Sequence, residues 1–176
     1  LGVRRQRQMC IRDRIDNLVL VIGKTEGHID QSLFARSILD EKNGPPPEVN
    51  LFNEKNNGES LLDLINKDYI QSAHDISLGG LITAISKMCI QGNKGIKLKK
   101  ANNFVNELEY LFCEDQGRYI IEIKPEDLKE VTNLLDKNSV HYDELGIITD
   151  KEMIINQKTK VTIDELKSYY TNWLTN

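Results

Sequence analysis

The stretch Ser72–Gly80 (SAHDISLGG) carries residue types that could do chemistry. Asp75 could hold a magnesium ion or orient a hydroxyl, and Ser77 could donate to an oxyanion. Gly79 and Gly80 would let a phosphate approach the unpaired N–H groups at the positive end of the following helix. The spacing matches neither a Walker loop nor a G-x-G-x-x-G fingerprint. The stretch is therefore a candidate phosphate-binding turn.

The spacing alone favours a structural interpretation of the same residues. Ser77 would cap the helix, the two glycines would allow close packing on a sheet, and His74 would satisfy a backbone group. His28 and His141 have no acidic or serine partner at a recognisable spacing. We interpret both as ordinary surface or core histidines.

A pair of acids, Glu114 and Asp115, lies just before Arg118. Two adjacent carboxyl groups could serve in general acid/base catalysis. A solvated loop in which these carboxylates pair with Arg118 is the simpler interpretation. We therefore expect a structural ion pair among these three residues.

Hydrophobic periodicity predicts alternating strands and helices. The run 17–23 is continuously apolar and β-branched, which is typical of a strand buried on both faces. Further strands are expected at 69–74, 95–98, 117–123, 140–149, 153–155 and 161–163, and helices at 31–39, 49–65, 78–90, 107–112, from 125 and at 164–174. Alternation of this kind favours one α/β domain, a three-layer sheet with helices on both faces.

Three details of these elements can be checked in a structure. Asp30 is the expected cap of the helix at 31–39, and the strand at 95–98 is expected at a sheet edge with its lysines in water. The helix at 49–65 is expected to present one apolar face, although Gly58 weakens it. The residues of that face would be Val49, Leu51, Phe52, Leu61, Leu62 and Ile65.

Composition excludes several classes of protein. The net charge of -4 and the pI near 5.5 argue against nucleic-acid binding, which requires a basic face. No apolar run reaches the roughly 20 residues of a membrane span, and no signal peptide is visible, so we expect a cytoplasmic protein. Cys10, Cys89 and Cys113 form no C-x-x-C pair, which indicates reduced, packed thiols.

Residues 1–14 differ from the rest of the chain. This segment holds five of the seven arginines and none of the sixteen lysines. It could be a basic arm, but its QRQMCIRDR stretch resembles translated sequencing-adapter bases. We interpret 1–14 as a non-native or artefactual segment and 15–176 as the domain.

Three stretches together resemble the C-terminal part of the phosphoribosylformylglycinamidine synthase (PurL) family. They are GPPPEVNLFNEKNNGESLLDLI, SAHDISLGGLITAISKMCI and LFCEDQGRYIIEI. Their order and spacing also match, over essentially 16–173. The resemblance implies an AIR synthase-related C-terminal domain, a fold shared with selenophosphate synthetase and the hydrogenase-maturation protein HypE.

The resemblance also implies an activity for the larger protein. Members of the family use ATP and Mg²⁺ to phosphorylate the amide oxygen of formylglycinamide ribonucleotide, and ammonia then displaces the phosphate. The catalytic histidine and the main metal ligands of the family lie upstream of this region, so no catalytic residue is expected here. Asp75, Ser77, Gly79 and Gly80 match a segment that would line an auxiliary nucleotide site.

The implied partners are the missing N-terminal lobes of the same synthase, the glutaminase subunit PurQ and the small subunit PurS. A metal role for the turn is weakened because Leu78 stands where many relatives carry Asp. Two alternatives stay open: the C-terminal lobe of another superfamily member such as selenophosphate synthetase, and a non-catalytic nucleotide-binding or interaction module.

Overall fold

A computed structural model describes residues 15–99, 106–156 and 158–172. The predicted alternation of strands and helices is confirmed. In chain order the elements are β1 (Leu18–Ile22), α1 (Leu33–Ser37), α2 (Leu51–Asn66), β2 (Ile70–Asp75), α3 (Gly80–Gly92), β3 (Gly95–Leu98), α4 (Glu107–Phe112), β4 (Tyr119–Ile123), the 3₁₀ turn η1 (Pro125–Asp127), α5 (Leu128–Lys137), β5 (Tyr142–Thr149), β6 (Glu152–Ile154), β7 (Lys160–Thr162) and α6 (Ile163–Asn172).

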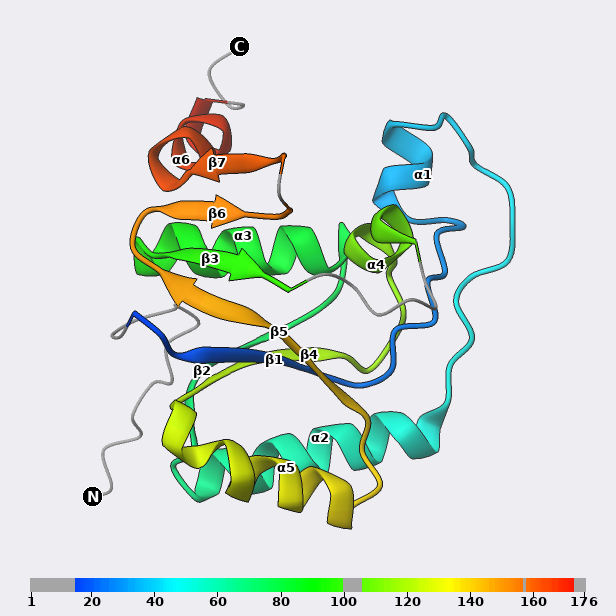
Figure 1. Cartoon of the computed structure of the whole chain (residues 1–176). Coiled ribbons are helices and arrows are strands. Elements are labelled where there is room, and N and C mark those ends of the chain that lie inside the picture. Colours follow the sequence, from blue (N-terminus) through cyan, green and yellow to red (C-terminus); the bar gives the residue numbers. More distant parts are fainter. Residues whose placement is uncertain (1–14, 100–105, 157, 173–176) are drawn as a thin grey trace, which may run out of the picture.

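All seven strands belong to one mixed sheet with the order β2-β4-β1-β5-β3-β6-β7. Neighbouring strands are antiparallel except for β3 and β6, which are parallel. Helices α2 and α5 lie on one face of the sheet, and α3 and α4 lie on the other (Figure 1). The expected three-layer α/β fold, with a mixed sheet between helices, is therefore confirmed.

Strand β1 shows why a continuous apolar run was required. Val19 and Val21 pack into the core beneath α3, while Leu20 and Ile22 pack into the core beneath α2 and α5. Successive side chains of a strand point to opposite faces, so a strand between two helical layers needs apolar residues at every position.

Strand β3 is not at the edge of the sheet, as the sequence had suggested. It pairs with β5 on one side and with β6 on the other. Ile96 and Leu98 enter the α3 core, whereas Lys97 points to the opposite face and is exposed. Among the described residues, the α2/α5 core includes none from β3. The lysine therefore marks an uncovered part of the sheet face, not an edge.

Helix α2 runs unbroken through Gly58, but the prediction of its buried face was largely wrong. Its fully buried positions are Asn57, Ser60 and Leu64. The two polar side chains are tolerated because each has a partner: Asn57 Nδ2 donates to the Gly117 carbonyl at 2.9 Å, and Ser60 Oγ accepts from Asn138 at 2.9 Å. The large apolar residues Val49, Leu51, Phe52 and Leu62 are exposed instead.

Helix α1 begins later than predicted and has a different cap. Ser32 is its N-cap, with the hydroxyl accepting from Ala35 N at 3.1 Å. Asp30 instead lies against Gly44 in the proline-rich connection between α1 and α2. A helix of five residues depends on such a cap because it has few internal hydrogen bonds.

The two cysteines in the described part of the chain are buried and free, as expected. Burial raises the pKa of the Cys89 thiol to about 12 and that of Cys113 to about 11. Neither thiol is reactive near neutral pH, because the thiolate is the nucleophile. Cys10 lies outside the described residues.

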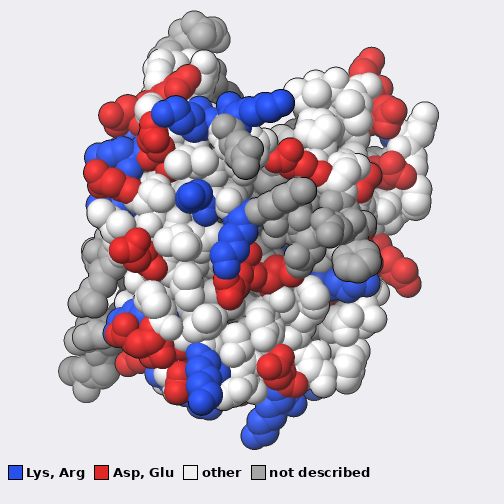
Figure 2. Space-filling model, in the orientation of Figure 1, with Lys and Arg blue, Asp and Glu red and all other residues white. Residues whose placement is uncertain are grey.

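The surface carries both signs of charge. Figure 2 shows lysine and arginine side chains interspersed with aspartate and glutamate on the face that it presents. Among the described helices, none is long and apolar enough to cross a bilayer.

A buried polar network crosses three neighbouring strands. Glu122 of β4 is fully buried and accepts from Asn17 Nδ2 at 2.8 Å and from Ser72 Oγ at 2.7 Å. Ser72 belongs to β2, and Asn17 directly precedes β1. Both partners are buried, so these bonds replace the water that the carboxylate loses on folding.

Removing one donor of this network should destabilise the fold. We expect Ser72→Ala to lower the free energy of unfolding by about 1–3 kcal/mol, because it removes the hydrogen bond from Ser72 Oγ to the buried Glu122 carboxylate. Ser77→Ala is the matched control, since that serine is exposed, and it should change stability by less than about 0.5 kcal/mol. Urea denaturation measures both, and equal values for the two variants would contradict the role of the network.

Candidate functional site

The candidate residues meet at one edge of the sheet because of how β1, β2 and β4 pair. Both β1 and β2 run antiparallel to β4, and the last residues of the two strands, Ile22 and Asp75, pair with Tyr119 at its start. The connections that follow β1 and β2 therefore lie beside the loop that precedes β4. This loop holds the acid pair and Arg118.

The predicted turn has two exposed and two buried positions. Asp75 and Ser77 are exposed, whereas Gly79 and Gly80 are buried. Helix α3 begins at Gly80 with Gly79 as its N-cap in the left-handed region (φ 84°), and no side chain caps it. The structure thus contradicts the interpretation that the Ser77 hydroxyl caps the helix; its carbonyl accepts from Gly80 N at 2.9 Å instead.

The position expected for a phosphate is occupied by a carboxylate of the chain itself. Glu114 Oε1 accepts from Gly79 N at 2.8 Å and from Leu33 N, in the first turn of α1, at 2.7 Å. One oxygen therefore serves the N-terminal ends of two helices, where a negative charge is favourable. Neither glycine N–H of the turn is left unpaired.

Asp115 binds a second group of backbone donors. Its Oδ2 accepts from Glu26 N at 2.8 Å and Gly27 N at 3.0 Å, and its Oδ1 accepts from His28 N at 3.1 Å. Three consecutive N–H groups after β1 thus converge on one buried carboxylate. Such charge-assisted bonds are roughly twice as strong as neutral ones.

Arg118 does not form the expected ion pair. Its guanidinium is almost completely buried and donates to the backbone carbonyls of Cys113 (2.8 Å) and Asp115 (3.2 Å) and to Thr25 Oγ1 (3.1 Å). Among the ion pairs within the described residues, none includes Arg118. The carboxylates of Glu114 and Asp115 are turned toward N–H groups, and carbonyl oxygens satisfy the guanidinium in their place.

Gly80 is required by close packing. It has φ 70°, and a Cβ there would lie 2.7 Å from the backbone of Phe112 and 2.8 Å from the carbonyl of Cys113. The start of α3 thus lies directly against the end of α4. Helix α1 packs on the same end, with the rings of Phe34 and Phe112 stacked at 4.4 Å between centroids. Here the close-packing interpretation of the glycines agrees with the geometry.

The histidines make local contacts. His74 Nδ1 donates to the Asp75 carbonyl at 2.6 Å, as the structural interpretation predicted. His28 Nε2 donates to the Pro45 carbonyl at 2.9 Å, and His141 pairs with Asp143 at 3.2 Å, an acidic partner that the spacing had not indicated. Within the described ranges, no group of three potential metal ligands comes together.

The carboxylate of Asp75 lies beside His74, with 3.4 Å between Asp75 Oδ1 and His74 Nδ1. Burial raises the pKa of the Tyr119 hydroxyl, and the negative charges of Glu54 and Asp75 raise it further. The Tyr119 hydroxyl is near Gly58 of α2. The N–H groups of Gly79 and Gly80 bind Glu114 and the Ser77 carbonyl, and not the carboxylate of Asp75.

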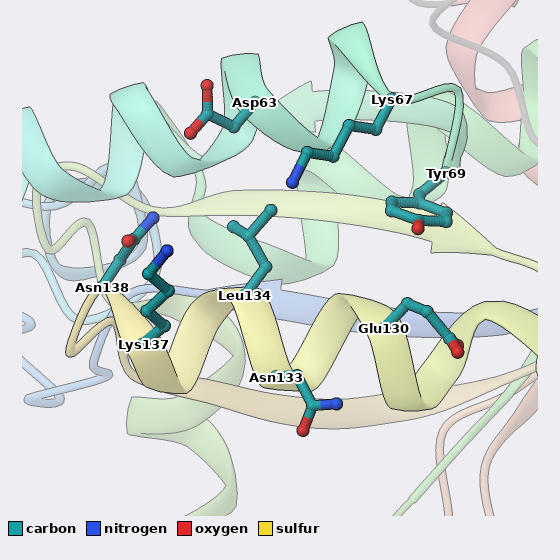
Figure 3. A pocket seen from close by; sticks show the side chains of 8 residues that line it. All are labelled: Asp63, Lys67, Tyr69, Glu130, Asn133, Leu134, Lys137 and Asn138. Atoms are coloured by element: carbon teal, nitrogen blue, oxygen red, sulfur yellow. The ribbon is translucent and has the colours of Figure 1, made fainter.

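A groove between α2 and α5 lies apart from these residues. It encloses about 340 Å³ and is lined by Asp63, Lys67, Tyr69, Glu130, Asn133, Leu134, Lys137 and Asn138. Figure 3 shows Lys67 and Leu134 pointing into it from the two facing helices. None of the predicted site residues lines this groove.

Comparison with known proteins identifies the family. The model of the family described as AIR synthase related protein, C-terminal domain, matches residues 14–157. The chain belongs to this family. The PurL subunit of phosphoribosylformylglycinamidine synthase from Pelagibacter ubique is 68% identical over 161 residues, and that from Bartonella henselae is 39% identical over 158. The resemblance to PurL is thus confirmed.

The family match covers only part of a longer protein in these relatives. The P. ubique alignment includes 92% of this chain but 22% of the relative, and the B. henselae alignment includes 90% and 21%. The chain therefore spans about a fifth of the length of the curated relatives it matches.

Solved structures confirm the AIR synthase-related fold. Thermotoga maritima PurL complexed with FGAR has a TM-score of 0.74 at 18% identity, covering 93% of this chain and 30% of that one. Escherichia coli HypE has a TM-score of 0.60 at 15% identity, covering 87% and 51%. At these identities the likeness concerns the fold alone.

Two glycine substitutions should have opposite effects on stability. Gly80→Ala should lower the free energy of unfolding by more than about 2 kcal/mol, since it combines a left-handed φ with a backbone clash. Gly58→Ala should raise it by about 0.5–1 kcal/mol, since a Cβ in mid-helix meets only the Tyr119 hydroxyl at 3.7 Å. Thermal and urea unfolding measure both changes, and a neutral Gly80→Ala would disprove the packing argument.

Proposed function

We propose that this chain is the C-terminal lobe of a cytoplasmic phosphoribosylformylglycinamidine synthase. The observation that carries the proposal is 68% identity to the P. ubique PurL subunit over 92% of the chain. The same identity favours PurL over the alternatives of a selenophosphate synthetase lobe or a non-catalytic nucleotide-binding module.

The proposed reaction joins nitrogen to an activated amide. The amide oxygen of formylglycinamide ribonucleotide attacks the γ-phosphorus of ATP, and ADP leaves. Ammonia then adds to the imidate carbon, and inorganic phosphate leaves with that oxygen while the nitrogen loses a proton, which gives the amidine. Two solved T. maritima structures, PurL complexed with ATP and the PurLQS assembly, support the use of ATP and these partners. We infer PurQ and PurS as partners of the larger protein.

The acidic side chains in the described part of this lobe do not fit a magnesium site. Mg²⁺ prefers carboxylate and water oxygens in octahedral geometry. Both carboxylates of the acid pair are already engaged by N–H groups, and among the described residues no group of three potential metal ligands forms around Asp75. We therefore place Mg²⁺, the triphosphate of ATP and the catalytic residues on the upstream part of the synthase.

We propose a nucleotide contact for the side chains of this turn, and not for its backbone N–H groups. The side chains of Asp75 and Ser77 are exposed where an auxiliary nucleotide could meet them, whereas Gly79 and Gly80 shape the turn and offer no N–H group. A hydroxyl contact from Ser77 to a phosphate oxygen is the form of the interaction that we propose.

The whole polypeptide that carries this chain provides the test of function. It should convert formylglycinamide ribonucleotide, ATP and ammonium to the amidine, with one ADP released for each product formed. Absence of the amidine, with folded protein confirmed by circular dichroism, would disprove the proposal.

The isolated 176-residue chain should be inactive. With magnesium and ATP it should release no ADP above a protein-free blank, whether or not the ribonucleotide is added, because the charge-neutralising groups lie elsewhere. A coupled ADP assay measures this. Release of ADP that depends on the ribonucleotide would show that the lobe carries catalytic residues of its own.

A further inference from the structure

One pair of adjacent residues holds together segments that are far apart in the sequence. Glu114 and Asp115 accept five backbone N–H bonds, all at 3.1 Å or less. The donors lie in the connection after β1 (26–33) and in the turn after β2 (Gly79). The two acids therefore act as a clamp, a name that we keep for this pair.

The segments that the clamp holds have little regular structure of their own. In the connection between β1 and α2, the only helix is the five-residue α1 (Figure 1). Three prolines follow that helix in the sequence. Both clamped segments follow strands that end at the start of β4. Irregular connections on a rigid sheet are where binding residues concentrate.

We propose that Glu114 and Asp115 are positioning residues of the synthase. They set the β1–α2 connection and the β2–α3 turn in one fixed arrangement without touching a substrate. This inference rests on the proposed function, since it assigns the clamped segments to the substrate-facing rim of the lobe. Arg118 supports the clamp by binding the carbonyls of the same loop.

The two acids differ in what a neutral replacement can do. The N–H groups bound by Glu114 converge on a single oxygen, Oε1, which glutamine also possesses. The N–H groups bound by Asp115 are divided between Oδ1 and Oδ2. Asparagine offers one oxygen and an NH₂ group that would face a donor, so at least one N–H group loses its bond. Glu114→Gln should be tolerated, whereas Asp115→Asn should open the clamp.

Amide hydrogen exchange on the 176-residue chain tests the clamp directly. Asp115→Asn should remove protection at one or more of the amides of residues 26–28, and Glu114→Ala should remove it at Leu33 and Gly79. Glu114→Gln should retain it, and Asp164→Asn, which changes an exposed acid on α6, is the matched control. Full protection at all the amides of residues 26–28 in Asp115→Asn would overturn the clamp.

Kinetics of the whole synthase separate positioning from mere stability. In Asp115→Asn and Glu114→Ala, the KM for the ribonucleotide or for ATP should rise about ten-fold, while kcat stays within about two-fold, because binding contacts are misplaced and reacting groups are not. Glu114→Gln should restore the wild-type KM. A purely structural role would reduce the yield of folded enzyme and leave KM unchanged.

The outcomes are distinguishable from failure of the proposed function. If the exchange results hold and KM is unchanged in every variant, the clamp exists but the positioning role is wrong. If the wild-type polypeptide forms no amidine, the proposed function fails, and the positioning role fails with it. A rise in KM together with loss of protection at the named amides supports the inference.

Discussion

One constraint governs the edge of the sheet where β1 and β2 end: the backbone N–H groups of the connections that follow these strands must find acceptors. A buried N–H group without a partner costs about as much as a lost hydrogen bond, and irregular connections have no neighbouring strand to supply one. Here two consecutive carboxylates, Glu114 and Asp115, supply the acceptors. Other features of the same edge follow from that arrangement.

The burial of Arg118 is one such consequence. With both carboxylates turned toward N–H groups, the carbonyls of their own loop point inward and need donors. The guanidinium meets two of these carbonyls and the Thr25 hydroxyl, so the loop is satisfied on both sides. The guanidinium of Arg118 and the carboxylate of Asp115 thus lie in the same buried loop without forming a salt bridge, and each is held by backbone dipoles.

Periodicity could predict much of the fold because the sheet lies between two helical layers. The apolar run of β1 divides between two cores, and helices of sufficient length appear at their expected places. Where periodicity was misleading, tertiary context was the reason. Lys97 faces an uncovered part of the sheet, and Asn57 and Ser60 are buried on α2 because partners on other elements reach them. Such partners are invisible in a single sequence.

The candidate site was harder to predict, since its main donors are backbone groups that all residues share. The sequence indicates an acid pair near an arginine, and opposite charges make an ion pair the natural expectation. The N–H groups that donate to these carboxylates instead belong to residues 35 to 89 positions away in the sequence. No side-chain type indicates which N–H groups will be used. The strand pairing around Tyr119 brings them to the acids, and this pairing is visible only in the structure.

A glycine turn at a helix start is commonly taken as a phosphate site because it combines unpaired N–H groups with a positive helix end. In this lobe both properties are present, yet Glu114 uses them internally. The anion that stabilises the turn is therefore part of the fold, and the turn needs no ligand to be satisfied. Acids that are bound to backbone N–H groups in this way fix the shape of the turn instead of offering their charge to a ligand. This use of the turn explains how chemistry-bearing residue types can gather here while the carboxylates of Glu114 and Asp115 are taken up by backbone N–H groups of the fold.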